Sequence, residues 1–196
     1  MSNAGGMSTV TRYTDMLAGN TTWNPWQPDG AYDALATVTV PAGGLASVTF
    51  AAIPNTYKHL QLRYTARDTF AATWDVAYLT FNGASSGYSW HELIGNGSTT
   101  PVAAGSSQSF IRLGRVTYAS STANVFAGGI LDVLDYANTS KNKTTRLLAG
   151  ADLNGDGFVL LDSGLYQSTS AITSMTITAA GTAFAQNSQF SLYGVK

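Results

Sequence analysis

Apolar and polar residues alternate with a period of two along most of this chain, and that alternation limits its possible folds more than any other feature. Residues 60–67 show it best, because Leu60, Leu62 and Tyr64 are separated by Gln61 and Arg63. Successive side chains of a β-strand point to opposite faces, so the pattern predicts strands with one buried face. No stretch of useful length has the periodicity of an amphipathic helix.

Turn signals separate the alternating segments. Asparagine, aspartate and glycine tolerate the positive φ angles that tight turns need, and Asn82-Gly83 and Asn96-Gly97 are two examples. Short strands joined by such turns predict an all-β, antiparallel β-sandwich that is jelly-roll-like. Besides 60–67, strands are expected at residues 37–40, 47–50, 77–81, 88–94, 109–113, 124–136, 144–149, 158–161, 172–178 and 190–195.

Two glycine pairs carry more specific predictions. Residues 41–44 read Pro-Ala-Gly-Gly, so we expect a hairpin turn that joins strand 37–40 to strand 47–50. Gly128 and Gly129 interrupt the run 124–136. They predict a bulge or bend that lets one strand serve two sheets.

Residues 1–33 lack any clean periodicity and form a predicted extended arm, which precedes a β-sandwich domain at residues 34–196. Pro25 and Pro28 cannot donate to a sheet ladder, and Trp23 and Trp26 need a surface to bury against. The two tryptophans either pack on their own domain or anchor the arm on a neighbouring subunit. We take these four residues as candidate partner-binding residues.

Charge is scarce in this chain. Only 11% of its residues are charged and its net charge is −1, whereas about 25% is usual for soluble proteins. Nucleic-acid binding needs a basic stripe, so no nucleic-acid partner is expected. Cysteine is absent, which excludes disulfides, thiol catalysis and thiolate metal sites.

Targeting signals are also lacking. The apolar runs are far shorter than the roughly 20 residues that span a bilayer, so no membrane partner is expected. The N-terminal residues show no basic region followed by an apolar stretch, so we expect no signal peptide. Such a protein is made in a cytoplasm and reaches any outside location by another route, such as cell lysis.

The strongest candidate for a metal site starts with Asp152, Asn154 and Asp156, followed by Gly157, as in the first half of a calcium loop. The twelfth position, which should be a glutamate, is Ser163, and no flanking helix is predicted. The segment is either an ordinary turn between two strands or a weak surface cation site. The ordinary turn is the prediction, with no bound metal or cofactor.

Candidate catalytic groups are few. His91 is followed by Glu92, but neighbours in a strand point to opposite faces and make no dyad. A carboxylate pair for glycoside chemistry would have to combine Glu92 with Asp132 or Asp135. His59 lies just before the clearest strand, on its polar side. These residues give no nucleophile–base motif, so the protein is predicted not to be an enzyme.

Three segments in order carry a resemblance. Residues 53–63 resemble the motif I-P-x-T-Y-K-H-L-Q-[IL]-R, residues 132–143 are similar to D-I-L-D-Y-x-N-T-x-K, and residues 188–196 end in F-S-L-Y-G-[IV]-K. This pattern resembles a family of virion structural proteins from tailed phages of cyanobacteria and marine hosts. The resemblance covers roughly residues 34–196.

The resemblance implies a non-enzymatic β-sandwich on the outside of a phage particle. It allows a capsid decoration (cement) protein, a head fibre or a tail-fibre tip. Family tail fibres carry the module at the end of a longer chain, so the short arm favours a decoration protein. The expected partners are then the major capsid protein on the outer capsid surface and further copies of the chain, as a homotrimer.

The alternative is a head or tail fibre, or a receptor-binding module, that recognises a host-surface glycan. Sugar recognition uses exposed aromatic side chains over hydroxyl-bearing loops. The candidates near loop-rich segments are Trp74, Tyr88, Trp90 and Tyr118. They should cluster at one end of the sandwich if this alternative holds.

Overall fold

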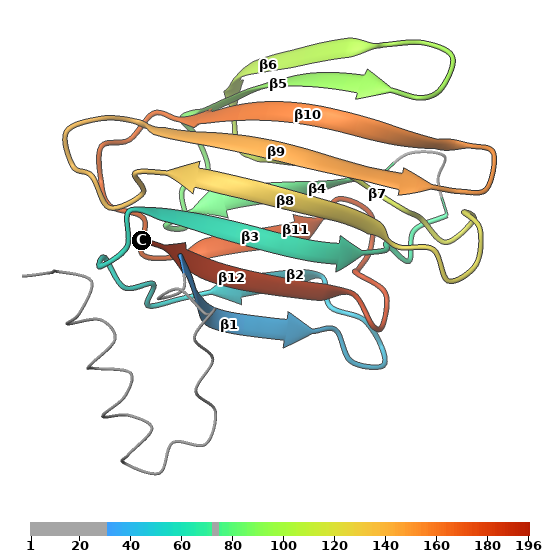
Figure 1. Ribbon diagram of the computed structural model, residues 1–196, viewed down its shortest axis with the longest axis horizontal. Coiled ribbons are helices and arrows are strands. Elements are labelled where there is room, and N and C mark those ends of the chain that lie inside the picture. Colours follow the sequence, from blue (N-terminus) through green and yellow to red (C-terminus); the bar gives the residue numbers. More distant parts are fainter. Residues whose placement is uncertain (1–30, 72–74) are drawn as a thin grey trace, which may run out of the picture. The chain divides into compact units, whose positions relative to one another are not determined.

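The computed structural model describes residues 31–71 and 75–196, and every regular element in that part of the chain is a β-strand (Figure 1). Two antiparallel sheets contain all of them. In spatial order, the larger sheet consists of β1 (Tyr32–Thr39), β12 (Gln189–Val195), β3 (His59–Ala66), β8 (Ala127–Leu134), β9 (Lys143–Asp152), β10 (Gly157–Tyr166), β5 (Tyr88–Gly95) and β6 (Val102–Gln108). The smaller sheet consists of β2 (Ser47–Phe50), β11 (Met175–Ala179), β4 (Asp75–Phe81) and β7 (Ile111–Val116).

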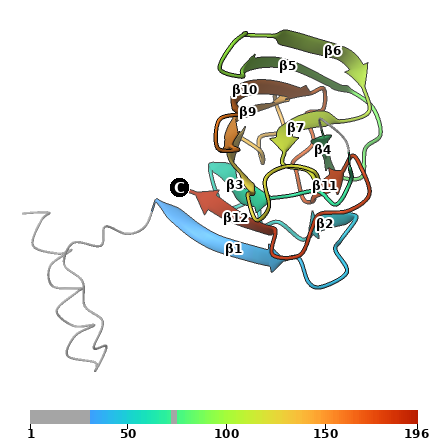
Figure 2. The ribbon, with the colours of Figure 1, turned by 90° about the vertical axis from the view of Figure 1, so that its right-hand side faces the viewer.

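The four-stranded sheet covers one face of the eight-stranded sheet (Figure 2). The inward-facing side chains fill the space between them, and Leu60, Leu62, Phe81, Phe184 and Phe190 are all buried there. Burial of each such side chain contributes roughly 1.5–3 kcal/mol, which explains why the alternating pattern sets the fold. The predicted all-β antiparallel sandwich is therefore confirmed, while its jelly-roll character stays a prediction.

The predicted hairpin at residues 41–44 is wrong. Strand β1 pairs with β12 in the larger sheet, whereas β2 pairs with β11 in the smaller one. The segment between them crosses from sheet to sheet and is held by a bridge between Leu45 and Phe184. Gly44 has a φ of 77°, and a Cβ there would lie 2.8 Å from the carbonyl oxygen of Phe184. The glycine therefore lets the chain pass close to Phe184 as it crosses from one sheet to the other. The alternation of apolar and polar residues cannot distinguish such a crossing from a hairpin.

The predicted bulge at Gly128 and Gly129 is also wrong. Strand β8 pairs with both β3 and β9 without a register shift, and all three lie in the same sheet. Gly129 instead makes room for a ring, because a Cβ there would lie 2.3 Å from Cζ of Tyr64. The Tyr64 hydroxyl donates a hydrogen bond of 2.9 Å to the carbonyl of Leu113, which links the two sheets.

The arm boundary differs slightly from its prediction. Strand β1 begins at Tyr32, two residues before the expected start of the domain, and Asp33 there pairs with Lys196 at 3.1 Å. Residues 1–30, with the candidate partner-binding residues Trp23, Pro25, Trp26 and Pro28, lie outside the described residues.

Strand β6 was not predicted, because its residues (VAAGSSQ) show no alternation.

Candidate functional site

A band of exposed apolar side chains crosses the outer face of the eight-stranded sheet. Five residues form it, one from each of five neighbouring strands, and we call them the apolar row. Each lies directly opposite the next in the strand register, in the order Val102, Leu93, Leu161, Leu148 and Ile130. Opposite residues of antiparallel strands have Cβ atoms about 4.5–5.5 Å apart, so the row is continuous.

These side chains are unusually exposed for their size. Their exposed fractions run from 44% at Ile130 to 74% at Val102, and Val159 beside the row is exposed by 61%. A shallow hollow of about 640 Å³ lies over the β5–β6 end of the row. Single exposed leucines are ordinary, but a contiguous apolar patch of this kind is a candidate interaction surface.

The two flanks of the row differ in kind. Two positions from the row on one side, hydrogen bonds connect Gln61 to Asp132 (2.9 Å) and Arg146 to Asp132 (2.8 Å). Arg63 donates to Gln61 at 2.7 Å and so joins this network. On the other side lie the glycines Gly128, Gly150 and Gly95, with the exposed Val159 between Gly150 and Gly95.

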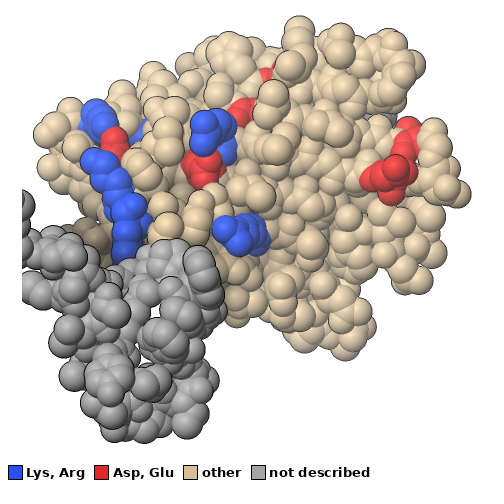
Figure 3. All heavy atoms as spheres, viewed as in Figure 1, with Lys and Arg blue, Asp and Glu red and all other residues tan. Residues whose placement is uncertain are grey.

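Charge is segregated along the strands of this face. The strands β3 and β9 start beside Lys58 and Lys141, whose ammonium groups both pair with Asp135. At the other end, the β9–β10 connection carries Asp152 and Asp156. Figure 3 shows basic side chains at the left and centre of this face, several of them beside acidic ones, and a separate acidic group at the right.

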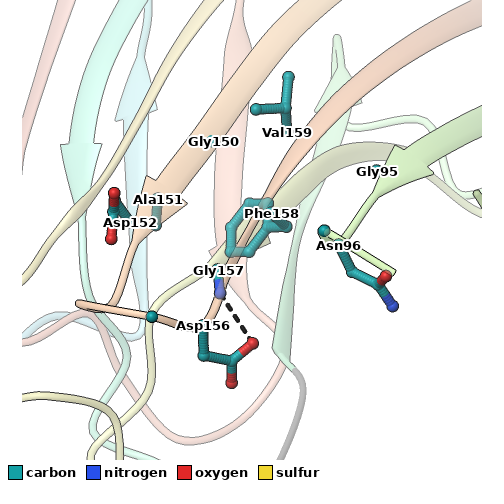
Figure 4. A pocket seen from close by; sticks show the side chains of 11 residues that line it. Gly95, Asn96, Gly150, Ala151, Asp152, Asp156, Gly157, Phe158 and Val159 are labelled. Atoms are coloured by element: carbon teal, nitrogen blue, oxygen red, sulfur yellow. Dashed lines mark hydrogen bonds between the residues drawn. The ribbon is translucent and has the colours of Figure 1, made fainter. Parts of the chain in front are cut away.

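The predicted calcium-like segment is the loop of the β9–β10 hairpin, as the turn interpretation requires. Its carboxylates bond the loop's own backbone: Asp152 accepts from the amide of Asn154 (2.8 Å) and Asp156 from that of Gly157 (2.7 Å). The two carboxylates point away from one another (Figure 4). Ser163, the twelfth position, lies within β10 opposite Arg146. Among the described residues no group of three acidic, histidine or cysteine side chains is placed to hold a metal.

Removal of calcium is therefore expected to leave folding unchanged. A site that binds only the native state adds stability that grows with ion concentration, and this loop already satisfies its carboxylates without an ion. Thermal melts in millimolar calcium and in excess chelator should give the same midpoint. A fall of several degrees with chelator would contradict this prediction, and the Asp152→Asn variant would then locate the site.

The structure does not bring Glu92 together with either of its candidate partners, Asp132 and Asp135. Asp132 lies on the outer face and bonds Arg146, whereas Glu92 is buried on the inner face. Asp135 sits at the end of β8, where hydrogen bonds from Lys141 and Lys58 lower its pKa to about 2. His59 accepts a hydrogen bond of 2.9 Å from the backbone amide of Asp135, which gives this histidine a structural partner.

Glu92 has a different carboxylate neighbour that the sequence did not single out. Asp162 lies directly opposite it in the register of β5 and β10, and both side chains are buried. Arg112 binds Glu92 at 3.1 Å and covers the Trp90 ring at 4.2 Å, whereas among the described residues no side chain bonds the Asp162 carboxyl, which has the backbone of Gly114 beside it. Burial, with the charge of Glu92, raises the pKa of Asp162 to about 8. This carboxyl group therefore keeps its proton at neutral pH.

The aromatic residues expected to bind glycans do not form an exposed platform. Tyr88 is fully buried and its hydroxyl bonds the backbone of Phe81. Trp90 is also buried, and Tyr118 is only half-buried. Trp74 lies outside the described residues. Tyr88 and Trp90 thus belong to the core.

No helix in the described part of the chain is long and apolar enough to cross a membrane. Comparison with known proteins finds no matching family model, no matching curated protein and no matching solved structure.

Proposed function

We propose that this protein is a non-enzymatic virion structural protein, a capsid decoration protein that binds the major capsid protein on the outer surface of a phage shell. The apolar row is the observation that carries the proposal. An uncharged apolar band on five neighbouring strands suits contact with another protein, and a component of a large assembly needs such surfaces.

The resemblance to phage virion proteins supports the same function through the fold. Its three segments pack against one another, because the Tyr136 hydroxyl donates to the carbonyl of Pro54 and accepts from the amide of Tyr57. The Tyr57 ring lies over Gly194, where a Cβ would approach it to 2.4 Å. The shared motifs therefore build the body of the sandwich, which explains why they indicate a virion component without choosing its place.

The receptor-binding alternative has less support. Sugar binding would need exposed aromatic rings, and the described candidates Tyr88 and Trp90 are buried. A glycan array probed with the intact protein separates the two functions. Specific glycan binding, together with no binding to capsids, would favour the fibre or receptor-binding function over decoration.

Removal of the arm is expected to abolish attachment to particles while the sandwich still folds. The deletion should end at residue 30, because β1 begins at Tyr32 and must stay intact to pair with β12. Burial of each tryptophan of the arm against a partner would contribute about 2–3 kcal/mol, so the loss should weaken binding strongly. Co-sedimentation with capsids measures attachment, and circular dichroism melts measure folding.

The double variant Trp23→Ala, Trp26→Ala is the matched test for the same arm. It should reproduce most of the loss of particle binding with an unchanged melting temperature. Normal binding by the truncated protein would show that the arm is dispensable. Unfolding of the truncated protein would show instead that the arm belongs to the core of the domain.

A further inference from the structure

We infer that a second copy of this chain covers the apolar row, with the two copies face to face about a two-fold axis that runs parallel to the row. This inference goes beyond the proposed function, because it assigns the apolar row to contact between copies of the chain and leaves capsid binding to other surfaces. The axis lies between the two large sheets, perpendicular to their strands. Each strand then faces its own equivalent in the other copy, running in the opposite direction.

The row itself is self-complementary under this rotation. A two-fold interface places the same patch of both copies in contact, so an apolar band must meet an apolar band. An axis parallel to the row places the whole row on the partner's row, with Leu161 at its centre. Two sheets stacked in this way lie about 10 Å apart, as in the core of a sandwich.

The charges at the strand ends favour this axis over one parallel to the strands, although the same rotation sets Arg63 opposite its own equivalent. The rotation exchanges the two ends of every strand, so Asp152 and Asp156 of one copy come over the end of the other that carries Lys58 and Lys141. Two ammonium groups share only Asp135 there, so an excess of positive charge remains for the partner's carboxylates. An axis parallel to the strands would place like charges together.

The flanks of the row fit each other in the same arrangement. Arg146, whose side chain is 70% exposed, stands on one flank, and the rotation brings it over the opposite flank of the partner. That flank contains Gly150 and Gly128, which face one another across β9 and β8. Arg146 of one copy thus lies over Gly150 of the other, next to the exposed Val159.

Gly128 gives independent support, because its own chain does not need a glycine there. It has no positive φ, and a Cβ at this position would meet no atom within 4 Å. Glycine inside a strand weakens it and packs against nothing, and one reason for its presence is close approach by another backbone or side chain. The approaching surface is the partner's, since the outer face of β8 is open in the single chain.

The test measures the mass of the full-length protein by light scattering and its dimer dissociation constant by analytical ultracentrifugation. We expect a dimer, and we expect the double variant Leu148→Asp, Leu161→Asp to raise the dissociation constant by about a hundredfold or more. Gly128→Glu should weaken the dimer as well, without loss of melting temperature. Thr49→Asp is the matched control, because it adds a charge to the outer strand β2 of the other sheet and should change nothing.

A charge exchange tests the orientation. Asp156→Lys and Lys141→Glu should each weaken the dimer, and the chain that carries both changes should recover part of the loss. A monomer, a homotrimer as expected from the resemblance, or a dimer that tolerates both aspartates in the row would each overturn the inference. A monomeric row variant that still binds capsids would be consistent with the decoration function. A stable dimer that fails to bind capsids would contradict the decoration function and leave the dimer inference intact.

Discussion

Replacement of Asp162 by asparagine is expected to stabilise the folded protein by roughly 5 kcal/mol at pH 8 and above, with little effect near pH 4. The side chain is only 5% exposed, and among the described residues no side chain donates a hydrogen bond to either of its oxygens. Asparagine has nearly the same shape and cannot ionise. Its amide group can also donate to the Glu92 oxygen that lacks a partner.

The sign of the pH dependence follows from the raised pKa. An aspartate in the unfolded chain loses its proton near pH 4, whereas folded Asp162 holds its proton up to a pKa of about 8. Between these values the folded state binds a proton that the unfolded state does not. The free energy of unfolding of the wild-type protein should therefore fall as pH rises from about 4 to about 8, and this fall should shrink in the variant. Urea titrations at several pH values measure both curves.

Asp132→Asn is the matched control, with the opposite sign. Burial alone would raise the pKa of Asp132, but hydrogen bonds from Gln61 and Arg146 outweigh it and lower the pKa. Its ionised form therefore stabilises the fold above the unfolded pKa, and this contribution is lost as pH falls through the folded pKa. The control variant should be less stable than the wild type at pH 7 and approach it in acid. Equal and parallel shifts in both variants would contradict the role assigned to the burial of Asp162.

The architecture could be predicted from the sequence because alternation reports directly on which side of a strand is buried. Strand β3 is the best case, since Leu60, Leu62 and Tyr64 are all buried and Arg63 is exposed. The path between strands could not be predicted in the same way. Residues 41–44 turn the chain in either a hairpin or a sheet crossing, and the contact with Phe184 that decides between them is distant in sequence.

The candidate contact surface was missed although the sequence contains a signal for it. Four members of the apolar row stand next to a buried residue in the chain, as in Ile130-Leu131, Leu147-Leu148, Leu160-Leu161 and Leu93-Ile94. One residue of each doublet faces the core, so the other must face outward. From the sequence alone, each doublet indicates only a strongly apolar strand. The strand register is needed to show that the outer residues of the doublets lie side by side. The register depends on pairing between distant segments, which local patterns do not contain.

The pairing of Glu92 with Asp162 was hidden for the same reason. Each carboxylate lies inside an apolar strand, and its position in the chain gives no hint of the other. Sequence reasoning instead paired Glu92 with Asp132 or Asp135, which lie on the outer face or at a strand end. A buried carboxylate inside an alternating strand, on its apolar side, is the signal that finds Asp162.

Replacement of Lys143 by methionine is expected to reduce the free energy of unfolding by about 3 kcal/mol, because it removes three hydrogen bonds that a buried ammonium group donates. The Lys143 side chain is fully buried. Its ammonium group donates to the main-chain carbonyls of Asn138, Lys141 and Thr169, the last two at 2.9 and 3.1 Å. It thereby ties the β8–β9 connection to the segment that follows β10.

Lys141→Met is the matched control two residues away. The Lys141 side chain is 54% exposed and pairs with Asp135, which keeps Lys58 as a second partner. Exposed ion pairs contribute at most about 1 kcal/mol, so this variant should lose far less stability. Urea unfolding at pH 7 compares the two, and hydrogen exchange should show faster opening of residues 135–142 in the Lys143 variant alone. Equal losses in both variants would mean that the positive charge of the β8–β9 connection, and not the three hydrogen bonds of Lys143, holds the two segments together.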